Sequence, residues 1–263
     1  MPANLGWVRQ FHKPGSIAGD RTPVARNGAT RPPLLICPHA GSGASAYRAF
    51  SKVLSEHFDV LIFQYPGRQD RAREAAASTL TELAAGAFAE FRGSEHNRGL
   101  PLTVFGHSMG AMVAFELVRA AEAAGIDVRL LAASAAVSPG RAADLPPHPT
   151  DDEQILDHLS NIEGTGADVL ASREVMRMAL PVVKADYRAF DAYTCPVDVR
   201  VQARIHVLGG AEDLLVTPRE LYGWANHSDQ EIEVTVFDGG HFYLHDNAAG
   251  IAELLAPELN RVA

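Results

Sequence analysis

The sequence has few of the features that mark membrane proteins, secreted proteins or nucleic-acid-binding proteins. None of its apolar runs approaches the ~20 consecutive residues that a membrane-spanning helix needs, so no membrane partner is expected. Residues 1–15 lack the apolar segment and small-residue cleavage site of a secretory signal, which predicts a cytoplasmic protein. Basic residues cluster only in 68–73 and the formal net charge is −9, so no nucleic acid partner is expected either.

Cysteine is also scarce, with only Cys37 and Cys195 present. The two are far apart and belong to no spacing of Cys and His that would hold a metal, so neither a disulfide framework nor a metal site is predicted. Cys37 ends the apolar run 34–36 and is interpreted as a small buried core residue. A cysteine nucleophile at this position is the less favoured alternative, since most buried cysteines are inert.

What the chain does contain is enough apolar sequence for one substantial domain. Of its 263 residues, 47% are apolar and 21% are charged, the balance of a globular protein. Short β-branched segments alternate with helical patterns and no internal repeat is visible, which predicts an α/β fold with a mostly parallel sheet in a single domain over 1–263. The expected strands are 34–38, 60–65, 102–106, 129–137, 204–209 and 232–237. The clearest expected helices are 80–91, with apolar residues at a helical period, and 111–124, closed by Gly125 as a C-cap.

Residues 138–201 break this alternation. The segment opens with proline and glycine and becomes acidic at 151–153. Apolar residues then recur every three or four positions from Met176 to Phe190, the pattern of a helix that is kinked or restarted at Pro181. So long a connection between two strands favours a helical lid inserted over the site, with ordinary crossover helices as the alternative.

One segment carries the pattern of an activated serine. Gly106-His-Ser108-Met-Gly110 matches G-x-S-x-G, with a β-prone run before the first glycine and a strong helix former after the last. The turn between such a strand and helix is so tight that the residues flanking the serine must be nearly free of side chain. The glycines meet that requirement, which predicts that Ser108 is a nucleophile lifted clear of the sheet at a helix N-terminus.

A serine hydroxyl needs a base to take its proton, and after this motif the chain order is serine, acid, histidine. His241 follows the expected strand 232–237 and the flexible pair Gly239–Gly240, so a loop can present its imidazole over the strand ends. His241 is therefore the expected base, with His245 as its nearest rival. His206 lies inside an expected strand and is interpreted as structural.

The expected acid is Asp213, in the loop that follows the strand 204–209. Parallel sheets build their sites beyond the carboxyl ends of their strands, and a carboxylate there can fix the histidine tautomer. The neighbouring Glu212 and Asp238 are the alternatives.

The oxyanion formed on attack needs two backbone N–H donors. One is expected from Met109, the residue after the nucleophile. The second is expected from Ala40 in the loop 38–43, where small residues let amides face the site. The alternative is a glycine-rich turn without a role.

Six blocks together carry a family resemblance. They are Trp7-Val-Arg-Gln-Phe11, Pro38-His-Ala-Gly41, Gln64-Tyr-Pro-Gly-Arg-Gln-Asp-Arg71, Gly106-His-Ser-Met-Gly110, 209–213 and Gly239-Gly-His-Phe-Tyr-Leu244. From near the N-terminus to the final helix, the sequence resembles the type II thioesterases, stand-alone enzymes of the α/β-hydrolase fold that accompany polyketide synthases and nonribosomal peptide synthetases. One block departs from the expected pattern: positions 39–43 read His-Ala-Gly-Ser-Gly where the family would have His-Ala-Gly-Gly, so Ser42 bears on the geometry around Ala40.

The resemblance implies an α/β-hydrolase fold. It implies hydrolysis of acyl or aminoacyl thioesters from the phosphopantetheine arm of acyl or peptidyl carrier protein domains, which edits stalled or misprimed synthases. Ser108, Asp213 and His241 would be the catalytic triad, with no metal or organic cofactor. Carrier domains are usually acidic, so Arg68, Arg71 and Arg73 are candidate contacts, with a solvated basic stretch as the favoured alternative.

Three other functions stay open. A carboxylesterase of small oxygen esters would use the same triad. A thioesterase domain that releases or cyclises a finished product is expected at the end of a long synthase, whereas this chain begins and ends on its own. A catalytically silent α/β-hydrolase that acts as a binding partner is disfavoured by the intact Ser108, Asp213 and His241.

Overall fold

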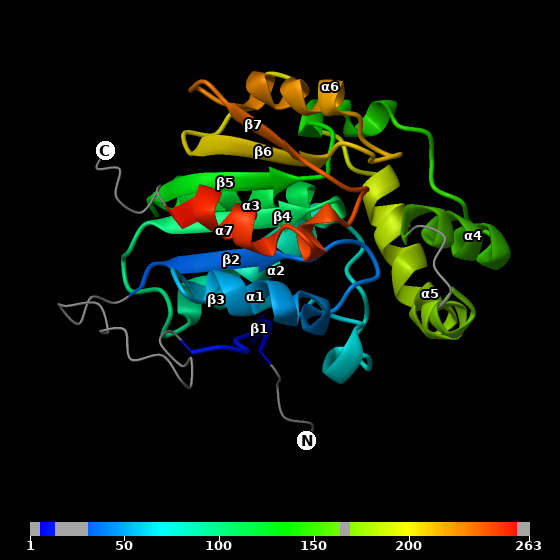
Figure 1. Ribbon diagram of the computed structural model, residues 1–263. Helices are drawn as coiled ribbons and strands as arrows, with labels where there is room; N and C mark the ends of the chain where they lie inside the picture. Colours follow the sequence, from blue (N-terminus) through cyan, green and yellow to red (C-terminus); the bar gives the residue numbers. More distant parts are fainter. Residues whose placement is uncertain (1–5, 14–30, 164–168, 257–263) are drawn as a thin grey trace.

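The architecture is a seven-stranded sheet with helices on both faces (Figure 1), seen in a computed structural model that describes residues 6–13, 31–163 and 169–256. The strands are β1 (Val8–Arg9), β2 (Pro33–Cys37), β3 (Asp59–Phe63), β4 (Leu102–His107), β5 (Val128–Ser134), β6 (Arg204–Gly210) and β7 (Glu233–Phe237). Their order across the sheet is β1-β3-β2-β4-β5-β6-β7. All neighbours pair in parallel except β1 and β3. The predicted mostly parallel α/β-hydrolase sheet is confirmed.

All six predicted strands are present, with ends that match or are shifted by at most three residues. The prediction missed β1, a two-residue edge strand that pairs antiparallel with β3. Its pairing is extended by a hydrogen bond from the Gln64 N–H to the Trp7 carbonyl (2.6 Å). A strand this short has no alternation of apolar and polar residues for a sequence pattern to detect.

Two apolar layers hold the helices against the sheet. Because side chains alternate across a strand, Leu35 and Cys37 of β2 face one layer while Leu34 and Ile36 face the other. The first layer contains α2 (Leu80–Gly93) and α3 (Met109–Ala123), and the second contains α1 (Arg48–Leu54) and α7 (Ala248–Leu255). Cys37 is fully buried in the first layer, as predicted.

The remaining short helices lie in the connections. They are η1 (Ala44–Tyr47), η2 (Gln69–Arg71), η3 (Pro139–Asp144), α6 (Pro218–Leu221), η4 (Tyr222–His227) and η5 (Tyr243–His245). Both clear helix predictions are confirmed as α2 and α3. The predicted C-cap of α3 is confirmed too, because Gly125 has a φ of +74° and the Ile126 N–H closes back onto the Ala121 carbonyl. None of the described helices is both long and apolar enough to cross a membrane.

The described parts of the segment 138–201 are largely helical and contain η3, α4 (Asp152–Glu163) and α5 (Val169–Asp191). In them, α4 and α5 lie beyond the carboxyl ends of the central strands (Figure 1). Leu180, Val183 and Tyr187 of α5 pack with two residues of α4 in a small core of their own. Pro181 lies on the exposed face of α5 and the helix continues through it, so the predicted restart does not occur. The side chain of Met176, the first residue of the predicted apolar pattern, lies outside the described residues.

Candidate active site

Ser108 occupies a tight turn between a strand and a helix. β4 ends at His107, α3 begins at Met109, and Ser108 between them has φ 55° and ψ −126°. A non-glycine residue held in this region costs about 1–3 kcal/mol, which the surrounding packing must offset. A Cβ on Gly106 would overlap the backbone of Gly110, and a Cβ on Gly110 would overlap the carbonyl of Cys37. The glycines of the motif are therefore required by the close approach of α3 to β4 and β2.

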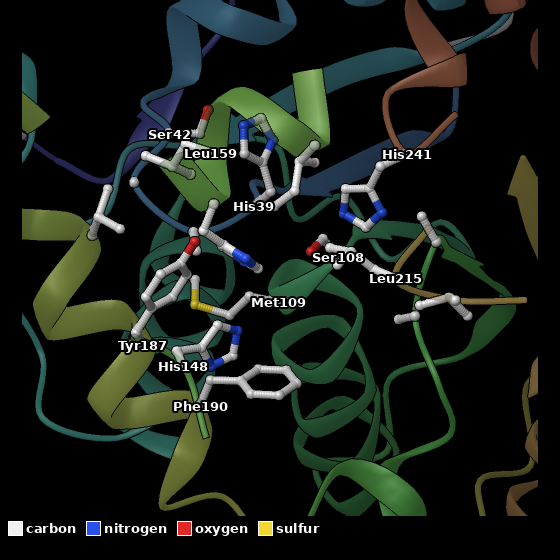
Figure 2. Close-up of a pocket in the computed structure, with 18 of the residues that line it drawn as sticks. His39, Ser42, Ser108, Met109, His148, Leu159, Tyr187, Phe190, Leu215 and His241 are labelled. Atoms are coloured by element: carbon white, nitrogen blue, oxygen red, sulfur yellow. The ribbon is translucent and has the colours of Figure 1, made fainter. Parts of the chain in front are cut away.

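His241 and Asp213 meet at the carboxyl ends of β6 and β7. The Nδ1 of His241 lies 2.8 Å from Oδ2 of Asp213, and both residues are about 95% buried. Because the carboxylate can only accept, Nδ1 carries the proton and Nε2 is left as an acceptor. Figure 2 shows the His241 imidazole directed toward Ser108 at the edge of the cavity.

The acidic partner of His241 is itself held by the backbone. Oδ1 of Asp213 accepts the N–H groups of Leu215 (2.8 Å) and Val216 (3.2 Å). The two loops are joined by the Glu212 N–H, which donates to the Gly239 carbonyl at 2.9 Å. Each oxygen of the Asp213 carboxylate therefore has a defined partner, and the loop that carries Asp213 is hydrogen-bonded to the loop that carries His241.

The rival residues of the sequence lie elsewhere. Glu212, Asp238 and His245 are exposed. His206 is buried in β6 and pairs through Nε2 with the Thr235 hydroxyl at 2.8 Å, so its structural interpretation is confirmed. Asp213 is thus the carboxylate that contacts His241.

The loop after β2 lies against the same turn, and the amides on both sides of Ala40 are engaged. The His39 N–H donates to the Tyr47 hydroxyl (3.2 Å) and the Gly41 N–H donates to Asp186 (2.7 Å). Ala40 and Met109 both line the cavity beside Ser108. The unexpected Ser42 is buried and donates its hydroxyl to the Gly43 carbonyl at 3.1 Å, so its side chain is bonded within the loop.

Two further histidines, for which the sequence predicts no role, lie near the predicted base: the rings of His107 and His241 are 5.1 Å apart between centroids, and those of His39 and His107 are 5.8 Å apart. His39 contacts Tyr47 through Nδ1 at 2.7 Å, and His107 contacts Ser134 through Nδ1 at 2.8 Å. Burial, followed by the positive charge of a protonated His241, lowers the pKa of His39 to about 3 and that of His107 well below 6.5. Both rings are therefore neutral near pH 7 and add no charge beside His241.

A cavity of about 690 Å³ opens over Ser108 and His241. Leu159, Tyr187 and Phe190 lie in the part of the wall that the segment 138–201 contributes (Figure 2), and Val183 also lines it. His148, also in the wall, stacks on Tyr187 with ring centroids 4.0 Å apart. A mostly apolar pocket with a few polar groups beside a hydroxyl and an imidazole is the usual form of a small-molecule site.

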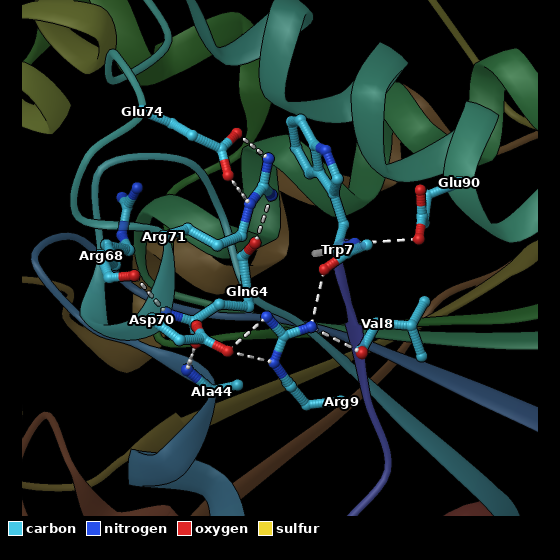
Figure 3. A network of polar contacts seen from close by, with 11 residues as sticks. Trp7, Val8, Arg9, Ala44, Gln64, Arg68, Asp70, Arg71, Glu74 and Glu90 are labelled. Carbon is cyan, nitrogen blue, oxygen red and sulfur yellow. Dashed lines mark hydrogen bonds and ion pairs between the residues drawn. The ribbon is translucent and has the colours of Figure 1, made fainter. Parts of the chain in front are cut away.

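The basic stretch 68–73 does not form the solvated surface that was expected. Arg68 and Arg71 are 3% and 4% exposed, so the sequence-based interpretation of these two residues was wrong, while Arg73 is exposed. Figure 3 shows the network that holds Arg71: it donates to the Gln64 carbonyl (2.7 Å) and pairs with both carboxylate oxygens of Glu74. Its guanidinium also lies 4.7 Å from the centre of the Trp7 ring. Because Trp7 directly precedes β1, this contact helps to hold the edge strand against the rest of the fold.

Within residues 6–13, 31–163 and 169–256, His, Cys, Asp and Glu side chains form no cluster of three or more that could hold a metal ion. Burial raises the pKa of the Cys37 thiol to about 12, so this cysteine is not a thiolate at neutral pH.

Comparisons with known proteins give one consistent picture. Residues 32–259 match the family model of the thioesterase domain. Phenyloxazoline synthase MbtB of Mycobacterium tuberculosis is 37% identical over 263 residues, which cover 98% of this chain and 17% of that protein. A probable cadicidin biosynthesis thioesterase of Streptomyces griseus is 36% identical over 96% of this chain and 66% of its own length. The type II thioesterase BorB from the borrelidin biosynthetic cluster superposes with a TM-score of 0.79 at 36% identity, over 96% of this chain and 97% of that one.

Proposed function

Because the chain belongs to the thioesterase family and resembles type II thioesterases of polyketide and nonribosomal peptide pathways over nearly its whole length, we propose that it hydrolyses acyl or aminoacyl thioesters on the phosphopantetheine arm of carrier domains. In this role it removes stalled or misprimed acyl groups from a synthase. The observation that carries the proposal is the His241–Asp213 pair, with Ser108 and His241 both lining a mostly apolar cavity.

The proposed mechanism uses the chain's own residues at each step. Ser108 Oγ attacks the thioester carbonyl while His241 Nε2 takes the hydroxyl proton, and Asp213 stabilises the imidazolium. The Ala40 and Met109 N–H groups stabilise the oxyanion. When the C–S bond breaks, His241 returns the proton to the leaving thiolate. Water, activated by the same imidazole, then attacks the acyl-serine and releases the carboxylic acid and the free hydroxyl.

The cavity supports an acyl chain with a substantial apolar part. Its volume of about 690 Å³ lies in the range of sites that enclose whole small molecules. Much of its wall comes from 138–201, so we propose that this segment is a lid within a single domain and that it limits the length of the acyl group. The carrier domain is the proposed partner that delivers the pantetheine arm to the cavity mouth.

The experiment that tests the function compares two substrate classes. Wild type and Ser108→Ala are assayed with acyl-pantetheine thioesters, acyl carrier proteins and nitrophenyl esters of the same acyl groups. We expect thioester turnover by wild type and none by Ser108→Ala, whose fold should be unchanged because the side chain carries little packing. Turnover of the oxygen esters alone would instead indicate a carboxylesterase. If wild type hydrolyses neither class and a fluorophosphonate does not label Ser108, a silent binding partner replaces the proposal.

A further inference from the structure

A buried carboxylate that the mechanism does not use contacts the loop proposed to bind the oxyanion. Asp186 lies on α5 and is 2% exposed. Its Oδ2 accepts the Gly41 N–H at 2.7 Å and forms an ion pair with Nη2 of Arg68. The three residues come from three separate segments: the loop after β2, the loop after β3, and the helical segment 138–201.

The arginine in this cluster is itself held in place. Nη1 of Arg68 donates to the Pro66 carbonyl (3.0 Å), and its guanidinium lies 5.0 Å from the centre of the Tyr65 ring. The Arg68 carbonyl accepts from the Gln64 side-chain amide (2.9 Å). Nε of Arg68 is buried without a hydrogen-bond partner among the described residues, so this charge pair is not fully satisfied, and an apolar pair of similar size would fill the same space at less cost. What the ion pair provides beyond packing is an acceptor for the Gly41 N–H.

That acceptor fixes the peptide plane next to the proposed oxyanion donor. The Gly41 N–H belongs to the peptide that follows Ala40, and the His39 N–H, on the peptide two planes earlier, is bonded to Tyr47. The Ala40 N–H lies between these two fixed amides. Gly41 has a φ of +73°, and a Cβ there would lie 2.5 Å from the Val183 side chain of α5, so the loop is pressed against this helix.

We propose that Asp186 is a positioning residue for the oxyanion hole: paired with Arg68, it holds the Gly41 amide so that the Ala40 N–H faces the reacting carbonyl. The proposal rests on the proposed function, because that function assigns the oxyanion to Ala40. Asp186 touches no reacting atom and acts only through the loop.

The test needs a variant that folds without the carboxylate. Asp186→Ala alone would leave Arg68 buried without a charge partner, so its failure to fold would not be informative. The double variant Arg68→Met with Asp186→Leu replaces both charges by apolar side chains of similar size and removes the acceptor for Gly41. Asp186→Asn is the conservative variant: it also removes the charge partner of Arg68, but its carbonyl oxygen can still accept from both Arg68 and the Gly41 N–H.

We expect the double variant to fold and to lose about 10²-fold in kcat, within the ~10²–10³ that a lost oxyanion donor typically costs, with KM changed little. The rate of fluorophosphonate labelling of Ser108, which also develops charge on an oxygen in the hole, should fall in parallel. The affinity of a non-reactive thioether analogue of acyl-pantetheine should not change. Asp186→Asn should retain more of the labelling rate than the double variant.

Asp59 provides the matched control. It is also a buried carboxylate paired with an arginine, Arg98, but it lies at the start of β3, at the end of the sheet away from the site. Asp59→Asn should lower the unfolding temperature without slowing the labelling of Ser108. A folded double variant that labels at the wild-type rate, or that loses thioether affinity by the same factor as kcat, would overturn the proposal. Labelling does not require the natural acyl group, so normal labelling of wild type without thioester turnover would count against the proposed function alone.

Discussion

Replacing Asp213 by asparagine changes one oxygen of the site into an amide nitrogen, and the surrounding donors decide which one. Oδ1 accepts the N–H groups of Leu215 and Val216, while Oδ2 faces His241 Nδ1 at 2.8 Å. The asparagine must keep its carbonyl oxygen on the two N–H donors, because an NH₂ group cannot accept from them. Its NH₂ group then faces Nδ1, so His241 must carry its proton on Nε2 and can no longer accept the proton of Ser108.

The size of the effect follows from this forced tautomer. Where the same carboxylate-to-amide change leaves the geometry of a serine triad intact, kcat falls by about 10⁴-fold. This loss corresponds to a rise of about 5 kcal/mol in the activation free energy. We expect a loss of this order for Asp213→Asn, with residual turnover from the oxyanion donors and little change in the unfolding temperature. The assay is kcat/KM for a medium-chain acyl-pantetheine thioester, followed by release of the thiol.

The neighbouring Glu212 is the matched control, since it is an exposed carboxylate directly beside Asp213 in the same loop. Glu212→Gln should stay within about twofold of wild type, as is usual for a surface substitution. A correctly folded Asp213→Asn that keeps more than a tenth of the wild-type activity, or a larger loss for Glu212→Gln, would refute the assignment of Asp213.

Three further predictions follow from the packing and charge of the site. Gly110→Ala should prevent correct folding or Ser108 labelling, because its Cβ would overlap the Cys37 carbonyl; a labelled and stable variant would contradict the close approach of α3 to β2. The pKa of His39 is lowered to about 3, so the unfolded state binds a proton first as the pH falls. The contribution of His39 to the free energy of unfolding is therefore fully present above pH 6.5 and falls by up to about 1.4 kcal/mol per pH unit toward pH 3. His107, whose pKa is also lowered, adds to the slope that denaturant unfolding should show, and His39→Gln should reduce that slope by the share of His39. Ala179→Phe, in the cavity wall, should shift the preference toward shorter acyl chains in a chain-length series, whereas Met178→Phe, on the 77% exposed neighbour, should not.

The parts of the fold and site that could be predicted from the sequence are those fixed by neighbouring residues. The turn at Ser108 depends on Gly106 and Gly110, and the apolar runs of the central strands are continuous because both faces of a parallel sheet are buried. The contact of His241 with Asp213 could be anticipated because both follow neighbouring strands at the same edge of the sheet. Chain order and strand ends were sufficient for these features.

The parts that could not be predicted depend on contacts between distant segments. Asp186 is 145 residues from Gly41 and 118 from Arg68, and nothing beside it in the sequence marks it as different from a solvated carboxylate. Arg71 was misjudged for the same reason, because a run of arginines is normally exposed. The sequence offered one signal that these arginines are buried: Trp7 and Tyr65, in the blocks 7–11 and 64–71, are aromatic, and a buried guanidinium can lie over an aromatic ring. In the structure Arg68 lies over Tyr65 and Arg71 lies over Trp7.

The two halves of the proposed catalytic apparatus are attached to different parts of the fold. Asp213 and His241 are held by the ends of β6 and β7, whereas the loop carrying Ala40 is held by Asp186 on α5. The same helix, through Val183, also forms part of the cavity wall. Substitutions in α5 that reshape the cavity for another acyl chain would therefore alter the contacts that hold the loop carrying Ala40, whereas His241 is held by Asp213. We expect acyl specificity and the rate of the chemical step to be coupled, so that exchanging 138–201 between relatives would alter kcat even for acyl groups short enough to avoid the proposed lid.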